Sequence, residues 1–291
     1  SIYNQNIHVL IDLSGHTARN RLPIFAWKPA PIQISWLGYF ASTGVPEMDY
    51  ILGDPFVTPV SEEHHYTEKI WRLPETYLCF TTPELDIKIN QLPASSNGVF
   101  TFGCFNNLSK LTDEVVKTRA SILHAVPNSR LFLKDKQLGF DEGRNRTLSR
   151  FAAHGIGSEQ LLLEGSSERQ EYLKSYNFVD IALSPFPYGG GTTSVEGLWM
   201  GVPVITRKGD YFLSHLGEAI AHNTNMSDWI AADNEEYIEL AIKFSSDLER
   251  LEKLRAGLRP SLLNTPLFDL PRFAKFFRKA LLEMREMIDH S

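Results

Sequence analysis

A glycine-rich stretch at residues 184–193 constrains the fold of this chain more than any other feature. It follows the apolar run 178–183, which is short and β-rich enough to be a buried parallel strand. Three consecutive glycines then allow a tight turn and the close approach of a ligand to the backbone. We expect Thr192 or Thr193 to cap a short helix, which Gly201 ends before the next strand. The stretch therefore predicts a strand, a glycine loop and a helix in direct succession.

Such a unit is suited to bind a phosphate or diphosphate group. The first N–H groups of a helix have no partner within the helix, and they carry a partial positive charge. A glycine triplet can also form an ordinary loop without a ligand. The sequence leaves both interpretations open.

The composition limits the classes of protein to which the chain can belong. A net charge of −6 over 291 residues argues against nucleic acid or an anionic membrane as the main partner. The sequence has no run of 18 apolar residues and no basic leader before an apolar segment. Its two cysteines cannot form a disulfide framework or a cysteine metal cluster. We therefore expect a cytoplasmic α/β protein.

Regular alternation of strands and helices begins at Val99, and we expect Thr112 to cap the first of these helices. The alternation predicts an α/β fold with a doubly wound parallel sheet. We assign residues 98–291 to this Rossmann-like domain, including the C-terminal helices. The loops at 105–110 and 184–193 both follow predicted strands, so they should lie at the carboxyl edge of the sheet, where ligands bind.

The first 93 residues predict four short strands, at 7–13, 32–37, 50–52 and 70–73, with one helix over 18–27. Such a sheet would leave most of its faces uncovered. We therefore expect residues 1–93 to be the second half of another Rossmann-like domain, whose first half is not in this chain. The polar, breaker-rich segment 81–98 is the predicted linker.

Three ionisable side chains are candidates for chemistry. Lys110 follows two amides, Asn106 and Asn107, and could neutralise a diphosphate leaving group, although a solvated surface lysine is the alternative. Glu196 lies one turn beyond Thr192 and could accept hydrogen bonds from ribose hydroxyls. It could also be an ordinary residue on the helix surface. His8 within an apolar strand fits a core histidine at least as well as a catalytic one.

Several other kinds of site are not supported by the sequence. It contains neither an H-E-x-x-H motif nor a Cys/His cluster, so we expect no metal site. The nucleophile elbow G-x-S-x-G is also missing, which weakens a serine-hydrolase interpretation. No G-x-G-x-x-G follows a strand, which weakens a dinucleotide oxidoreductase.

Ordered motifs along nearly the whole chain resemble the catalytic region of the protein O-GlcNAc transferase and SPINDLY family, glycosyltransferase family 41. The motifs are the segments at 14–17, 19–22, 29–33, 36–39, 48–50, 102–110 and 126–129, the glycine loop with its two threonines, and the segment 200–203. The resemblance implies a GT-B arrangement of two Rossmann-like domains with a nucleotide-sugar between them and no metal or other cofactor.

The activity that the resemblance implies is inverting transfer of a sugar to serine or threonine of a polypeptide acceptor. In this family tetratricopeptide repeats usually precede the catalytic region and recruit acceptors. By the same analogy Lys110 stabilises the departing nucleotide, and His8 lies at the active-site cleft. The implied donor-binding residues are Asn107, Tyr172, Gly190, Gly191, Thr192, Thr193, Glu196, Leu37 and Gly38. No general base is assigned.

Two positions depart from the animal O-GlcNAc enzymes. Those enzymes have histidine where this chain has Gly191, and a base-contacting histidine where it has Tyr172. Several blocks are more similar to the plant SPINDLY branch, whose donor is GDP-fucose. We therefore expect UDP-GlcNAc as donor, with GDP-fucose as the alternative. A nucleotide-sugar-binding fragment without transferase activity and an enzyme acting on free nucleotide sugars, such as an epimerase, also remain open.

Overall fold

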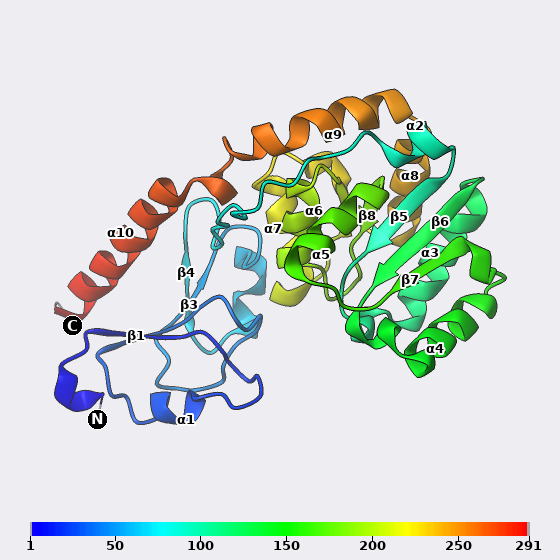
Figure 1. Cartoon of the computed structure of the whole chain (residues 1–291). Helices are drawn as coiled ribbons and strands as arrows, with labels where there is room; N and C mark the ends of the chain where they lie inside the picture. The colour runs from blue at the N-terminus through cyan, green and yellow to red at the C-terminus, as the bar shows by residue number, and fades with distance from the viewer. Residues whose placement is uncertain (1, 290–291) are drawn as a thin grey trace. The chain divides into compact units, whose positions relative to one another are not determined.

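The computed structural model describes residues 2–289, which form two compact units (Figure 1). Unit 1 comprises residues 2–81, 210–215 and 266–289, and unit 2 comprises residues 82–209 and 216–265. Each unit contains one sheet of parallel strands, as the sequence predicts. In the described part of the chain, no helix is both long and apolar enough to span a membrane.

Unit 1 has a four-stranded parallel sheet in the order β1-β2-β3-β4. All four predicted strands are present, but the predicted helix over 18–27 is wrong except for one turn. Its first half cannot be helical because Arg19 has a φ of +62°. The elements are β1 (Val9–Asp12), α1 (Leu22–Phe25), β2 (Ile32–Ser35), β3 (Tyr50–Gly53), β4 (Lys69–Arg72) and the C-terminal helix α10 (Leu270–Asp289).

Helix α10 packs on the sheet of unit 1, which corrects the expectation that the last helix belongs with the second domain. Phe273, Ala280 and Met284 of α10 share a core with Ile34 and Leu52 of the sheet. This apolar face gives the four short strands a cover that the sequence did not reveal, because the helix follows β4 by almost 200 residues. The compact units therefore differ from the predicted ranges 1–93 and 98–291.

Unit 2 has a six-stranded parallel sheet in the order β10-β9-β8-β5-β6-β7. Its strands are β5 (Phe100–Cys104), β6 (Ser129–Lys134), β7 (Leu161–Glu164), β8 (Ile181–Leu183), β9 (Val204–Arg207) and β10 (Ile230–Ala231). Its helices are α2 (Pro93–Asn97), α3 (Asp113–Ala125), α4 (Asp141–Ala152), α5 (Arg169–Ser175), α6 (Thr192–Trp199), α8 (Asn234–Ser245) and α9 (Leu248–Leu262), and α7 (Phe212–His222) begins in unit 1 and ends in unit 2.

Both faces of this sheet are covered, which confirms the doubly wound arrangement. Leu131, Phe132 and Leu133 are consecutive in β6, and all three are buried. Because successive side chains of a strand point to opposite faces, layers must pack on both sides. The predicted cap of α3 is also confirmed, since the Thr112 side chain accepts a hydrogen bond from the N–H of Val115.

The predicted linker at 81–98 is part of unit 2 rather than a free connection. Ile87 and Leu92 are buried, and Ala94 lies in the short helix α2. The fully buried Asp180 accepts hydrogen bonds from the N–H groups of Ala94 at 2.9 Å and Thr101 at 2.7 Å. This carboxylate therefore fixes α2 to the central strands of the sheet.

Candidate functional site

The strand order of unit 2 reverses between β5 and β8. From β5 the chain adds β6 and β7 on one side, and it then returns to add β8 and β9 on the other. Open α/β sheets bind ligands at the carboxyl ends of the strands at such a reversal. The loops that follow β5 and β8 are the two loops that the sequence selects. The Nζ atom of Lys110 in the first loop donates to the carbonyl of Gly189 in the second at 2.9 Å, so the two loops meet.

Two serine hydroxyls fix the backbone of the glycine loop. The N–H of Gly190 donates to Ser184 Oγ at 3.0 Å, and Ser194 Oγ donates to the Gly190 carbonyl at 3.0 Å. A Cβ atom at Gly190 would lie 2.5 Å from Ser194 Oγ and 2.6 Å from Thr193 Oγ1. Only glycine therefore fits at residue 190 without displacing these hydroxyls. A Cβ atom at Gly191 would meet open space.

Helix α6 begins at the glycine loop, but the predicted threonine cap is wrong. Gly191 is the N-cap residue, Thr192 is the first helical residue, and no side chain caps the helix. The Thr193 hydroxyl donates instead to Asn106 Oδ1 at 3.2 Å. The start of α6 thus offers backbone N–H groups and its dipole at the same loop that contacts Lys110.

Lys110 has an ammonium group that is largely enclosed by protein. Besides Gly189, it contacts Asn106 Oδ1 at 3.4 Å and lies 3.5 Å from the centroid of the Tyr188 ring. Burial lowers the pKa of Lys110 from 10.5 to about 8, with the Cys104 thiol acting weakly in the opposite direction. The solvated-surface interpretation of this lysine is therefore wrong.

Asn106 reaches the glycine loop, whereas the selected residue Asn107 does not. The exposed Asn107 side chain caps the short 3₁₀ turn at Leu108–Lys110 by accepting from the N–H of Ser109. The two amides are adjacent in sequence, and the sequence gives no signal that separates them. Asn106 is the site residue that the sequence-based selection missed.

Glu196 in α6 is buried, and the half-buried Tyr172 of α5 lies near it. The Glu196 carboxylate is 2.5 Å from Arg169 Nη1. Burial raises the pKa of Glu196, while Arg169 and Tyr172 oppose the rise. Tyr172 OH lies 3.2 Å from Tyr176 OH, which donates to the Thr193 carbonyl at 2.9 Å. Glu196 is therefore not an ordinary surface residue. Tyr172 contacts the threonine pair through Tyr176, which bonds the Thr193 carbonyl.

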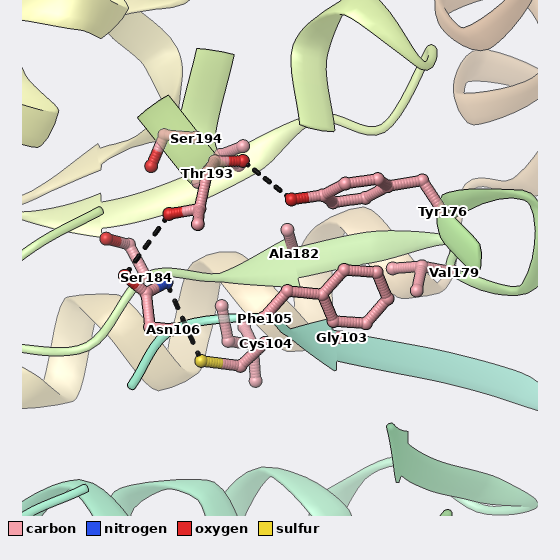
Figure 2. Close-up of a pocket in the computed structure, with 12 residues that line it drawn as sticks. Gly103, Cys104, Phe105, Asn106, Tyr176, Val179, Ala182, Ser184, Thr193 and Ser194 are labelled. Atoms are coloured by element: carbon pink, nitrogen blue, oxygen red, sulfur yellow. Dashed lines mark hydrogen bonds between the residues drawn. The ribbon is translucent and has the colours of Figure 1, made fainter. Parts of the chain in front are cut away.

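A small cavity lies between the end of β5 and the start of α6 (Figure 2). Its volume is about 10 Å³, and Asn106, Tyr176, Ser184, Thr193 and Ser194 line its polar side. This volume admits about one water molecule. The cavity is therefore part of the packing under the loop, and a nucleotide would have to bind on the outer side of the loop.

Leu37 and Gly38 lie at the carboxyl edge of the sheet in unit 1. They follow β2, and a Cβ atom at Gly38 would lie 1.8 Å from the carbonyl oxygen of Leu13, which follows β1. Leu37 has a φ of +74°, a conformation that costs energy in a non-glycine residue and is concentrated at functional sites. The same edge holds His16, whose ring packs edge-on against Tyr39 at 5.3 Å.

His8 lies at the amino end of β1, opposite to the carboxyl edge of the sheet. It precedes β1 and is exposed, so the interpretation as a core histidine is wrong. Because β1 and β2 are parallel, the amino end of β1 is remote from the edge that carries Leu37. The structure therefore does not bring His8 to the carboxyl edge of its sheet.

The described residues contain no group of three or more His, Cys, Asp or Glu side chains that could hold a metal ion. Two cationic groups contact the glycine loop: the Lys110 ammonium at the Gly189 carbonyl, and the Arg207 guanidinium 4.1 Å from the centroid of the Phe186 ring.

Comparisons with known proteins give one family. The sequence profile described as glycosyl transferase family 41 matches residues 1–84 and 88–277. A relative named probable UDP-N-acetylglucosamine–peptide N-acetylglucosaminyltransferase SPINDLY from Petunia hybrida is 37% identical over 94% of this chain and 30% of its own length. The corresponding protein SEC from Arabidopsis thaliana is 33% identical over 97% of this chain and 30% of its own length. The chain thus spans about a third of these relatives.

A solved structure of a mutant O-GlcNAc transferase from Thermobaculum terrenum is similar to the whole chain. It matches with a TM-score of 0.91 at 35% identity, over 99% of this chain and 54% of the other. This match confirms the predicted GT-B-like α/β fold class. Together with the profile and the relatives, it shows that the chain belongs to glycosyl transferase family 41.

Proposed function

We propose that this chain is the catalytic region of a protein O-glycosyltransferase, which moves a sugar from a nucleotide-sugar to serine or threonine of polypeptides. The observation that carries the proposal is the Lys110 ammonium, which is held against the glycine loop at the start of α6. These two features supply positive charge at one place. A nucleoside diphosphate leaving group needs such charge as its bond to the sugar breaks.

In the proposed reaction the acceptor hydroxyl attacks the anomeric carbon of the donor. A new carbon–oxygen bond forms on one face while the bond to the diphosphate breaks on the other, so the configuration inverts. Lys110 and the N-terminal N–H groups of α6 stabilise the charge that develops on the diphosphate, which is the role that a metal ion has in other transferases. The hydroxyl proton goes to a base that we leave unassigned.

UDP-GlcNAc is the proposed donor, because the names of the SPINDLY and SEC relatives specify it. GDP-fucose is the second candidate. At the two positions where the animal enzymes have histidines, this chain has the half-buried phenol of Tyr172 and a glycine, Gly191. Polypeptide acceptors and upstream tetratricopeptide repeats belong to the proposal, since the chain spans only part of its relatives.

Calorimetric titration of the chain with UDP and with GDP, without metal, tests the proposal. We expect UDP to bind more tightly than GDP, and UDP-GlcNAc to label a serine- and threonine-containing peptide. A preference for GDP with fucose transfer would change the donor but keep the reaction class. Binding of neither nucleotide would contradict the proposal and favour a fragment without activity.

A further inference from the structure

The side chain of Asn106 connects three parts of the site in unit 2. Its Oδ1 atom accepts from Thr193 Oγ1 at 3.2 Å and from Lys110 Nζ at 3.4 Å, and its Nδ2 atom donates to Cys104 Sγ at 3.8 Å. Figure 2 shows this amide between Cys104 at the end of β5 and Thr193 of α6. One half-buried side chain thus joins the strand, the lysine and the helix.

The contacts fix the orientation of the amide. The oxygen faces two donors, an ammonium and a hydroxyl, and the NH₂ group faces a sulfur atom, which is a weak acceptor. Rotation of the amide by 180° would point its NH₂ group at the lysine ammonium, and a donor would then oppose a donor. The Thr193 hydroxyl must therefore give its hydrogen to Asn106.

The same amide limits where the lysine ammonium can lie. Lys110 has three N–H groups, and its ammonium contacts the Gly189 carbonyl, Asn106 Oδ1 and the face of the Tyr188 ring. The hydrogen bond to Asn106 is longer than the one to Gly189, as is common for a catalytic group before its ligand binds. Of these neighbours, Asn106 is the one that also holds α6.

We propose that Asn106 is a positioning residue that aligns the Lys110 ammonium with the start of α6, so that both act on the same diphosphate. This inference rests on the proposed function, because the diphosphate is that of the nucleotide-sugar. Asn106 itself touches the two groups that would bind the diphosphate, and it acts by holding the lysine ammonium at the helix. Its loss should uncouple the lysine from the helix without unfolding the unit.

Substitution of Asn106 should change the pH dependence of the reaction as well as its rate. Two other titratable groups face the ammonium, the Cys104 thiol on β5 and the Tyr188 phenol in the glycine loop. Asn106→Asp places a carboxylate at the ammonium and should move the alkaline limb of kcat/KM upward by about one pH unit or more. Asn106→Leu removes the acceptor and should move the limb downward.

The rates of these variants provide the first part of the test. We expect Asn106→Leu to lower kcat/KM by about tenfold to a hundredfold, the range for loss of a hydrogen bond to a charged group. Matched controls are Asn264→Leu and Asn264→Asp, because Asn264 is exposed at the end of α9 with one long hydrogen bond to Pro260. The controls should leave both the rate and the pH limb unchanged.

A double-mutant cycle separates positioning from general damage. Affinity for UDP is measured by calorimetry for Asn106→Leu, Lys110→Met and the double variant. If Asn106 acts through Lys110, its substitution should change affinity by less than about twofold once the lysine is gone. The proposal would be overturned if Asn106→Leu weakened UDP binding as much in the Lys110→Met background as it does in the wild-type protein.

An NMR titration of Lys110 in labelled protein requires no nucleotide-sugar. It therefore tests the positioning role of Asn106 separately from the proposed transferase function. The expected result is a higher pKa of Lys110 in Asn106→Asp and a lower one in Asn106→Leu. If wild-type protein transfers no sugar but the pKa of Lys110 shifts in this way, the proposed function fails and the contact stands. If wild-type protein transfers sugar and neither variant changes its rate, pH limb or pKa, the positioning role is wrong.

Discussion

Lys110 does not have the chemistry of an ordinary surface lysine. Its burial lowers the pKa to about 8, so the free protein loses the positive charge as the pH rises through 8. Because the proposed reaction needs that charge, kcat/KM should fall above about pH 8, since this parameter reports the ionisation of the free enzyme. A pH–rate profile from 6 to 10 measures the limb.

Lys110→Arg is the control for this limb. A guanidinium stays charged over the whole range, so the fall near pH 8 should disappear even though the variant is slower. If Lys110→Arg kept the same limb, another group would be responsible for it.

Residue types and spacing make Lys110, the glycine loop and Glu196 candidates for chemistry, but they do not predict how each side chain is held. Asn106 and Asn107 have the same chemistry, and only the turn after β5 directs one to the loop and the other to a cap. His8 was predicted within a strand, yet β1 begins one residue later, and the side chain is exposed. Side-chain direction at the end of a strand depends on such single-residue shifts.

At the scale of elements, the connection from the glycine loop to α6 tolerates different changes at neighbouring positions. Gly190→Ala would place a methyl group within 2.6 Å of two hydroxyl oxygens, whereas Gly191→Ala would place it in open space. We expect Gly190→Ala to lower the free energy of unfolding by about 1–3 kcal/mol. The cost of Gly191→Ala should stay below about 1 kcal/mol.

Urea unfolding followed by circular dichroism measures both glycine variants under the same conditions. Equal costs for the two alanines would contradict the packing described for the loop.

The sequence predicts most elements of unit 2 because most strands are apolar runs and several helices, such as α3, α8 and α9, begin after a capping residue. Thr112 caps α3 as expected, whereas α6 starts at Gly191 without a side-chain cap. The prediction of a threonine cap for α6 is wrong because the Thr193 hydroxyl donates to Asn106, which is distant in the sequence. Tertiary hydrogen bonds of this kind leave no local pattern in the sequence.

At the scale of the whole chain, the last helix stabilises the first sheet. Met284 of α10 is fully buried against unit 1, whereas Met287 on the same helix is 51% exposed. Met284→Ala should destabilise by about 2–5 kcal/mol. Met287→Ala should change the free energy of unfolding by less than about 0.5 kcal/mol.

In denaturant unfolding, the stability lost in Met284→Ala should appear in the transition of unit 1. The two transitions can be separate because a chain of two compact units need not unfold in one step. A loss in the transition of unit 2 alone would contradict the packing of α10. The sequence could not predict this contact, since an amphipathic face shows that a helix is covered but not by which sheet.

The proposed reaction depends most directly on the charge of Lys110, so sugar transfer by Lys110→Ala is the central measurement. The matched control is Lys253→Ala, which removes an exposed lysine of α9 that pairs only with Glu249 among the contacts described. We predict that Lys110→Ala lowers transfer to a peptide by about a hundredfold to a thousandfold while the circular dichroism spectrum and the control activity stay unchanged. Transfer by Lys110→Ala at the wild-type rate would contradict the account.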